Sequence, residues 1–227
     1  MNKKIPIIVE FNGLPGLGKT TVANILIKEL TQLGYKTIRN YRHNIFHTLR
    51  HPFPELYDLK LFKLVSSYSK QILPTTHKRT HVHWTNFYVQ KYESIIKCSD
   101  ADFVIVDEGI IQFFEAMAYQ DIMPKSDLVD AIIKRIMSKG VSFIRVDCKN
   151  NIDEAANRIM TRPQRGLAFE RMQYDELRNT LENWALNFDY LRLAFSNVYG
   201  NQEVVEIDTN KNPIQNANII KNYLLRR

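Results

Sequence analysis

Short apolar segments of the chain alternate with longer segments in which apolar residues recur every three or four positions. The short segments have the length of β-strands, and the longer ones have the periodicity of helices that bury one face. The first short segment is apolar at nearly every position, which is typical of a strand covered on both faces. The predicted strands are residues 5–11, 36–39, 102–107, 141–147 and 204–208.

Longer segments between these strands predict helices with recognisable ends. The first helix covers residues 19–33 and joins the first two strands. A helix that ends near residue 161 has Asn151 or Asp153 as its cap, and Asn212 can cap the last helix, because both residue types favour that position. The other helices predicted in the second half of the chain are residues 110–119, 126–139 and 169–195.

Residues 41–98 contain no convincing strand and are predicted to be a helical insertion between the second and third strands. Helices are expected at residues 55–72 and 82–97, with prolines marking the limits of the first. The strand, helix and strand that precede the insertion favour parallel pairing with a right-handed crossover. We therefore expect an α/β domain whose insertion lies over the carboxyl ends of the strands, where ligands bind in open sheets.

A glycine-rich turn, GLPGLGKTT at residues 13–21, joins the first strand to the first helix. Gly13, Gly18, Lys19 and Thr20 fit the pattern G-x-x-x-x-G-K-[ST] of a phosphate-binding loop. Glycines let backbone N–H groups wrap around phosphate oxygens, and the helix N-terminus adds donors and the positive end of its dipole. Lys19 is expected to reach the β- and γ-phosphates, and the Thr20 hydroxyl is expected to bind magnesium.

The third predicted strand ends in acidic residues. The sequence DFVIVD at residues 102–107 is followed by Glu108 and Gly109. An aspartate at the end of a buried strand, opposite a phosphate-binding loop, is suited to orient magnesium through water. Asp107 is therefore a candidate metal ligand, and capping of the next helix is its alternative role.

Arginines cluster after the fourth predicted strand. Arg158 and Arg162 are four residues apart and share a helix face, while Pro163 and Gly166 give the following turn the character of a hinge. We expect a mobile lid at residues 158–171 that closes over transferring phosphoryl groups. An ordinary basic loop is the alternative. The arginines of this cluster are Arg158, Arg162, Arg165 and Arg171.

The charge of the chain is concentrated in one segment. The formal net charge is +7, and most of the excess basic residues lie in residues 39–79, which suits attraction of an anion. The alternative is a solvated surface. All six histidines lie in residues 43–83, but no carboxylate or cysteine accompanies them at ligand spacing, so a metal site is not favoured. Cys98 and Cys148 form no C-x-x-C pair, and neither a disulfide framework nor a zinc site is expected.

With 227 residues and 44% hydrophobic residues, the chain has the size of a single domain with one substantial core. No run of about 18 apolar residues occurs, and the first strand begins close to the N-terminus. We therefore expect neither a membrane span nor a removable signal, and a cytoplasmic protein.

The order of elements and three motifs resemble the P-loop nucleoside and nucleotide kinases, most of all the thymidylate kinase and deoxynucleoside kinase branch. The resemblance implies a doubly wound, five-stranded parallel sheet in a single domain that covers residues 1–227. It implies ATP and magnesium as cofactors and a small-molecule acceptor, and it leaves a homodimer open. The core would comprise residues 1–40, 100–150 and 200–227. The motifs are GLPGLGKTT at residues 13–21, VIVDEG at 104–109 and NRIMTRPQRG at 157–166.

For single residues, the resemblance implies that Arg162 and Arg165 touch phosphates from the lid, with Arg158 beside them. Asp107 would lie between donor and acceptor. The residues that would hold the triphosphate are Gly13, Leu14, Pro15, Gly16, Leu17, Gly18, Lys19, Thr20 and Thr21.

Two departures from that family concern the acceptor. Glu108 stands where the family usually has an arginine, and RNYRHN after the second strand replaces its usual acidic motif. The acceptor is therefore expected to contact Arg39, Arg42 or His43 in addition to Glu108.

The favoured function is transfer of the γ-phosphoryl group of ATP to a nucleoside monophosphate or related small anionic acceptor, which the basic segment would position. A kinase for a nucleoside or other hydroxyl acceptor is the second hypothesis, with Glu108 or Asp107 as base. A P-loop ATPase or regulatory switch is the third. The adjacent acids support it by offering a site for the attacking water, and the arginine lid argues against it. Nucleic-acid substrates are not expected, because no RGG-like segment or further domain occurs.

Overall fold

The computed structural model describes residues 5–39, 100–107, 109, 130–131, 134, 142–149, 151–163, 168–199 and 204–227. The predicted helices at residues 55–72, 82–97 and 110–119 lie outside these ranges. Of the predicted helix at residues 126–139, the described positions 130, 131 and 134 are helical.

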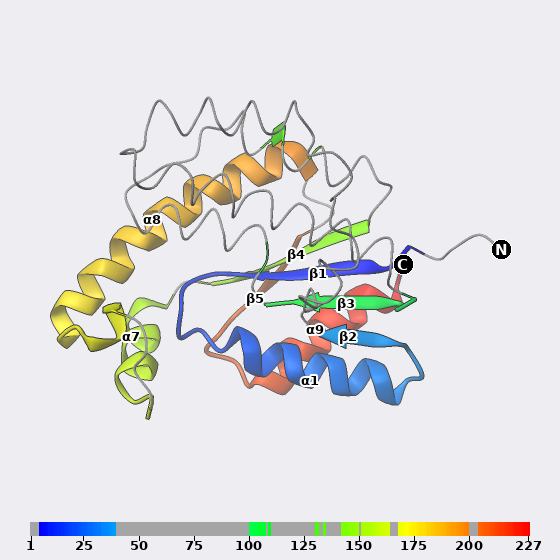
Figure 1. Ribbon diagram of the computed structural model, residues 1–227, viewed down its shortest axis with the longest axis horizontal. Helices are drawn as coiled ribbons and strands as arrows, with labels where there is room; N and C mark the ends of the chain where they lie inside the picture. Colours follow the sequence, from blue (N-terminus) through cyan, green and yellow to red (C-terminus); the bar gives the residue numbers. More distant parts are fainter. Residues whose placement is uncertain are drawn as a thin grey trace, which may run out of the picture.

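Five parallel strands form one sheet, which confirms the predicted architecture (Figure 1). Their order across the sheet is β2-β3-β1-β4-β5, so β1 is central and the chain winds first to one side of it and then to the other. Open α/β sheets bind ligands beyond the carboxyl ends of the strands at such a switch point. In chain order the strands are β1 (Ile7–Asn12), β2 (Thr37–Arg39), β3 (Phe103–Val106), β4 (Ser142–Cys148) and β5 (Val204–Ile207).

Each predicted strand is present, with ends that lie within two residues of the prediction. The first strand covers Ile7–Asn12 instead of residues 5–11, because its hydrogen bonding to the neighbouring segment begins where Ile7 N–H donates to the Asp102 carbonyl at 2.9 Å. Asp107 lies just beyond β3, and Asp208 lies just beyond β5. Both carboxylates are thereby placed in loops at the same edge of the sheet.

Two helices, α1 (Lys19–Gln32) and α9 (Pro213–Leu225), cover one face of the sheet and lie side by side (Figure 1). Alternate residues of the strands, such as Val9 and Ile144, share one buried apolar cluster with Leu26 of α1 and Ile220 of α9. Removal of this apolar surface from water is the main contribution that holds both helices on the sheet.

The opposite face of the sheet carries charged residues that the nearly apolar pattern of the strands did not indicate. Glu10 of β1 and Arg145 of β4 are paired in register, and both are buried. Arg145 forms an ion pair with Asp147 at 2.8 Å and donates a hydrogen bond to the Arg192 carbonyl at 3.2 Å. Because Arg192 belongs to α8 (Tyr174–Tyr199), that helix contacts this face, and helices cover both faces as in a doubly wound fold.

The long helix predicted at residues 169–195 was placed wrongly at both ends. Residues Ala168–Arg171 form a 3₁₀ helix, and α8 begins only at Tyr174 and ends at Tyr199. The first turn of α8 contains Asp175 and Glu176, whose negative charges favour a helix N-terminus. The aromatic spacing on which the prediction relied marks a buried face and does not locate a terminus.

Helix α7 (Ile152–Met160) and helix α9 both begin at an asparagine cap. The Asn151 side chain accepts a hydrogen bond from the Glu154 N–H at 3.1 Å, so Asn151 is the cap of α7 and Asp153 is not. Asn212 caps α9 by accepting from the Ile214 N–H at 2.9 Å, as predicted.

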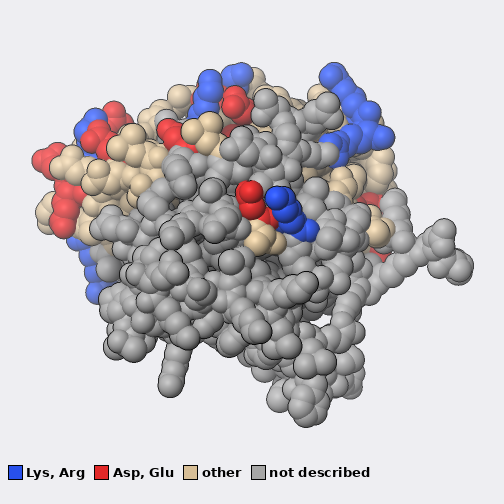
Figure 2. Space-filling view, turned by 90° about the horizontal axis from the view of Figure 1, so that it is seen from above, with Lys and Arg blue, Asp and Glu red and all other residues tan. Residues whose placement is uncertain are grey.

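Where α7 and α8 meet, described acidic and basic side chains are interspersed (Figure 2).

No helix within the described ranges is both long enough and apolar enough to cross a membrane.

Candidate active site

The turn between β1 and α1 has a backbone that only glycine accommodates. Gly16 has a φ of 87°, and a Cβ added to it would lie 2.6 Å from the Ala155 carbonyl oxygen of α7. Gly18 has a φ of 79° and precedes α1 without any side-chain cap, and the first turn of α1 contains no acidic residue. The first N–H groups of α1 are thus left for an anion, as expected for a phosphate-binding loop.

Lys19, the first residue of α1, folds back over this loop. Its ammonium group donates hydrogen bonds to the carbonyl oxygens of Gly13 and Leu14, the latter at 2.9 Å. The positive charge is therefore held at the loop, where the sequence motif predicts that it meets the β- and γ-phosphates.

Three side chains predicted for metal and acceptor binding meet at the carboxyl ends of β2 and β3. The Thr20 hydroxyl donates a hydrogen bond to Asp107 Oδ2 at 3.0 Å. Arg39 Nη2 lies 2.6 Å from the same oxygen, and Arg39 Nη1 donates to Asn24 Oδ1 at 2.7 Å. Asp107 itself is buried. Neighbouring strands, β2 and β3, supply the ion pair, and α1 supplies the hydroxyl and the amide.

These oxygen donors fit magnesium better than a transition metal. A hydroxyl and a carboxylate are hard ligands, and magnesium is typically held by one or two protein oxygens together with phosphates and water. Among the described residues, no group of three or more His, Cys, Asp or Glu side chains is arranged to hold a metal ion. Such a site would rely on a bound nucleotide to complete the coordination of the metal.

The loop and the predicted lid arginines line one cavity of about 500 Å³. Arg158 lines the cavity from α7 and Arg162 from the residues that follow α7, and Lys19, Thr20 and Asp107 line it as well. Arg158 pairs with Glu154 at 2.6 Å. The sequence prediction that the loop and these two arginines can share one ligand is consistent with this arrangement.

A buried acid anchors the second of these arginines. Arg162 Nη1 lies 2.7 Å from Glu170 Oε1, and the Glu170 side chain is only 6% exposed, whereas that of Arg162 is 42% exposed. Glu170 belongs to the 3₁₀ helix before α8. Arg162 is thus held by a partner eight residues further along the predicted lid segment.

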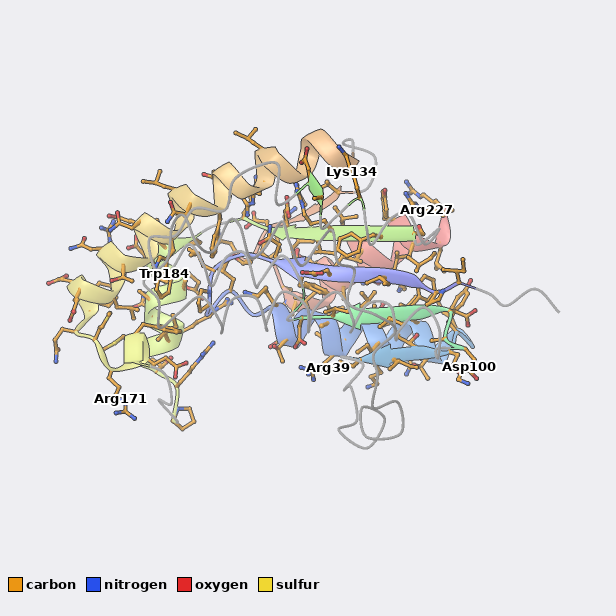
Figure 3. All side chains as sticks on the ribbon, turned by 45° about the horizontal axis from the view of Figure 1, so that its top comes forward. Arg39, Asp100, Lys134, Arg171, Trp184 and Arg227 are labelled. Atoms are coloured by element: carbon orange, nitrogen blue, oxygen red, sulfur yellow. The ribbon has the colours of Figure 1, made fainter. Side chains whose placement is uncertain are left out.

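Not every predicted site residue is in this cluster. Arg171 is exposed and, among the described residues, is not one of those that line the cavity; Figure 3 labels it beside the start of α8. Gly13 and Leu14, whose carbonyl groups accept from Lys19, and Arg39 do not line the cavity either. Four further predicted site residues lie outside the described ranges, and their prediction is unchanged: Arg42, His43, Glu108 and Arg165.

One wall of the cavity was missed by the sequence analysis. Thr209 and Lys211, from the turn after β5, and Asn216, from the first turns of α9, line it together with Phe169. Asn216 is 1% exposed, and its Nδ2 donates to the Asp208 carbonyl at 2.8 Å. A signal was available, because a turn that follows a parallel strand lies at the same edge as the phosphate-binding loop.

No protein-family model matches the sequence, and no curated protein matches it. Among solved structures, deoxyadenosine kinase from M. mycoides with the products dCMP and a flexible dCDP bound aligns with a TM-score of 0.55 and 16% sequence identity, over 97% of this chain and 100% of that chain. The same enzyme with dATP bound aligns with a TM-score of 0.50 and 15% identity, over 96% and 98%. With dCTP bound the values are 0.50 and 15%, over 97% and 100%. The likeness is one of fold and extends over nearly all of both chains.

Proposed function

We propose, for a chain that has the fold of the P-loop nucleoside and nucleotide kinases, that it transfers the γ-phosphoryl group of ATP to a nucleoside monophosphate or a related small anionic acceptor. The observation that carries the proposal is the shared cavity of the phosphate-binding loop, Arg158 and Arg162. Catalysis of phosphoryl transfer consists mostly of positioning and of neutralising charge, and these groups supply both.

In this proposal residues 13–21 hold the triphosphate. Backbone N–H groups of the loop and of the first turn of α1 donate to phosphate oxygens, and Lys19 exchanges its carbonyl partners for the β- and γ-phosphates. Arg162, with Arg165 of the lid, neutralises the charge that builds up during transfer. Thr20 and Asp107 would hold magnesium, which would supply further neutralisation of the phosphates when it is bound with ATP.

The acceptor is proposed to bind beyond the ends of β2 and β3. Arg39 places a guanidinium group there, and Arg42 and His43 follow it in the sequence. A phosphate nucleophile is already anionic and needs cations to position it more than it needs a base. Asp107 accepts hydrogen bonds from Thr20 and Arg39, so its Oδ2 atom is already engaged by two donors.

We also propose a division of labour within one domain, residues 1–227. The sheet and its flanking helices would hold the donor, the insertion at residues 41–98 would cover the acceptor, and residues 158–171 would act as the lid. The ion pair between Arg162 and Glu170 supports the proposed lid, because it links two distant positions within residues 158–171.

A screen for ADP release across nucleosides, nucleoside monophosphates, sugars and oligonucleotides tests the proposed activity. We expect one or a few monophosphates to stimulate ADP release well above the rate with ATP alone. Stimulation by any single compound would exclude an ATPase without acceptor. Stimulation by sugars or oligonucleotides alone would contradict the proposed class of acceptor.

The fold likeness to deoxyadenosine kinase favours a second candidate, a nucleoside with a hydroxyl acceptor group. Such an acceptor requires a base, for which Glu108 is the candidate. For an anionic acceptor we expect Glu108→Gln to change kcat less than about threefold, since no proton has to be removed. Glu176→Gln, at an exposed position of α8, serves as the matched control. A fall in kcat of about a hundredfold with unchanged KM would favour the hydroxyl acceptor instead.

A further inference from the structure

Arg39, a predicted acceptor-binding residue, also forms an ion pair with Asp107, the candidate metal ligand. Its guanidinium group lies 2.6 Å from Asp107 Oδ2, the oxygen that also accepts the Thr20 hydroxyl. We infer that Arg39 and the divalent metal compete for Asp107, so that Arg39 is the counter-ion of the metal-free site and metal loading releases it toward the acceptor. The inference rests on the proposed function only for the identity of the metal site and of the acceptor.

The position of Arg39 is built by more than one contact. Besides the pair with Asp107, its Nη1 donates to Asn24 Oδ1 at 2.7 Å. Asn24 lies four residues after Thr20, so both side chains are on the same face of α1. Figure 3 shows Arg39 beside this helix. The guanidinium group therefore spans from β2 to α1 across the end of β3, and the Asn24 contact can hold it near the site after Asp107 is lost.

The ion pair between Arg39 and Asp107 is partly buried, which distinguishes it from a pair at the surface. The Asp107 side chain is 6% exposed and that of Arg39 is 35% exposed. A carboxylate that is nearly out of contact with water requires a compensating positive charge, whereas pairs between exposed side chains contribute little. In a site without metal, Arg39 supplies that charge.

A metal ion cannot simply be added to this arrangement. The Thr20 hydroxyl gives its hydrogen to Asp107 Oδ2, and Arg39 donates to the same oxygen, so this oxygen is already engaged before a metal or its water approaches. A divalent cation and a guanidinium group close to one carboxylate also repel each other. We therefore expect binding of the metal at this carboxylate to displace Arg39, and removal of Arg39 to favour the metal.

The test measures binding of Mn²⁺ by electron paramagnetic resonance in the presence of a non-hydrolysable ATP analogue, which completes the coordination of the metal, so it does not depend on turnover. We expect Arg39→Ala to bind Mn²⁺ about tenfold more tightly than the wild type, as expected from the loss of one competing charge at a partly buried site. Asn24→Ala should give a smaller gain, because the pair with Asp107 remains. Asp107→Asn should lose most of the binding.

Lys36→Ala is the matched control, since it also removes a cation from the β2 region, one that pairs with Asp100 at the surface. We expect no change in Mn²⁺ affinity for this variant. In Arg39→Ala, guanidinium ions at tens of millimolar should weaken Mn²⁺ binding again, and equal concentrations of sodium chloride should not. Thermal unfolding of each variant checks that it is folded.

Unchanged or weaker Mn²⁺ binding in a folded Arg39→Ala variant would overturn the inference, because a purely structural ion pair predicts that result. The proposed function fails separately, in the absence of any acceptor that stimulates ADP release. Tighter Mn²⁺ binding without phosphotransfer would retain the competition at Asp107 and refute only the proposed reaction.

Discussion

Phosphotransfer by the Lys19→Ala variant is expected to fall by about a thousandfold, the loss found when a charged group that stabilises a transition state is removed. Lys19 is expected to supply a charge-assisted contact to the phosphates of ATP. No other residue of the loop, residues 13–21, has a basic side chain. The measurement is the initial rate of ADP release at saturating ATP and acceptor, together with the affinity for ATP.

Lys28→Ala is the control for this substitution, because Lys28 lies on the same helix and is exposed. It should retain the wild-type rate. Lys19 also donates hydrogen bonds to the carbonyl groups of Gly13 and Leu14, so its loss can lower the stability of the loop. The thermal unfolding of the Lys19→Ala and Lys28→Ala variants therefore has to be compared. A folded Lys19→Ala variant with a near wild-type rate would remove the basis for assigning the loop to ATP.

The second large effect is expected for Arg162→Ala, with a fall in kcat of about a hundredfold or more and a smaller change in the affinity for ATP. Arg162 lines the cavity and is held there by buried Glu170, so its guanidinium group is available for charge that develops during transfer. An effect on kcat and not on binding separates this role from simple attraction of ATP.

Arg178→Ala is the control, because this arginine also carries a positive charge but pairs with Asp153 and Glu182 of α7 and α8. We expect it to leave kcat unchanged. If both arginine variants lost activity to the same extent, the loss would reflect the net charge or the stability of this region, and the lid assignment would fail.

The sequence located those features that depend on neighbouring residues. The turn at residues 13–21 was recognised because its glycines and Lys19 occur at fixed spacing, and the cap at Asn212 was recognised from its own side chain. The parallel sheet followed from the order of strands and helices. Asp107 and Arg158 were proposed from their place after a strand and on a helix.

Features that depend on tertiary contacts were not recognised. Thr209 and Asn216 reach the cavity because β5 lies next to β4, and although the order of the strands points to this edge of the sheet, no local motif marks these two residues. The buried charges of Glu10 and Arg145 lie in strands that otherwise suggested apolar faces, and Arg145 is paired with Asp147 of the same strand and with a carbonyl of α8. The contact of Arg39 with Asp107 likewise joins residues that are far apart in the sequence.

The close approach of Gly16 to Ala155 has a practical consequence for redesign of the donor site. A larger residue at position 16 would displace α7 and, with it, the backbone of Arg158. We therefore expect that a substitution there changes the position of Arg158 as well as the nucleotide site. Thr209 and Lys211 line the same cavity from the turn after β5, and the Thr209 carbonyl, which accepts from Arg158 Nη2 at 3.5 Å, is kept when the side chains are substituted. Directed evolution toward other nucleoside triphosphates should therefore begin in the turn that follows β5.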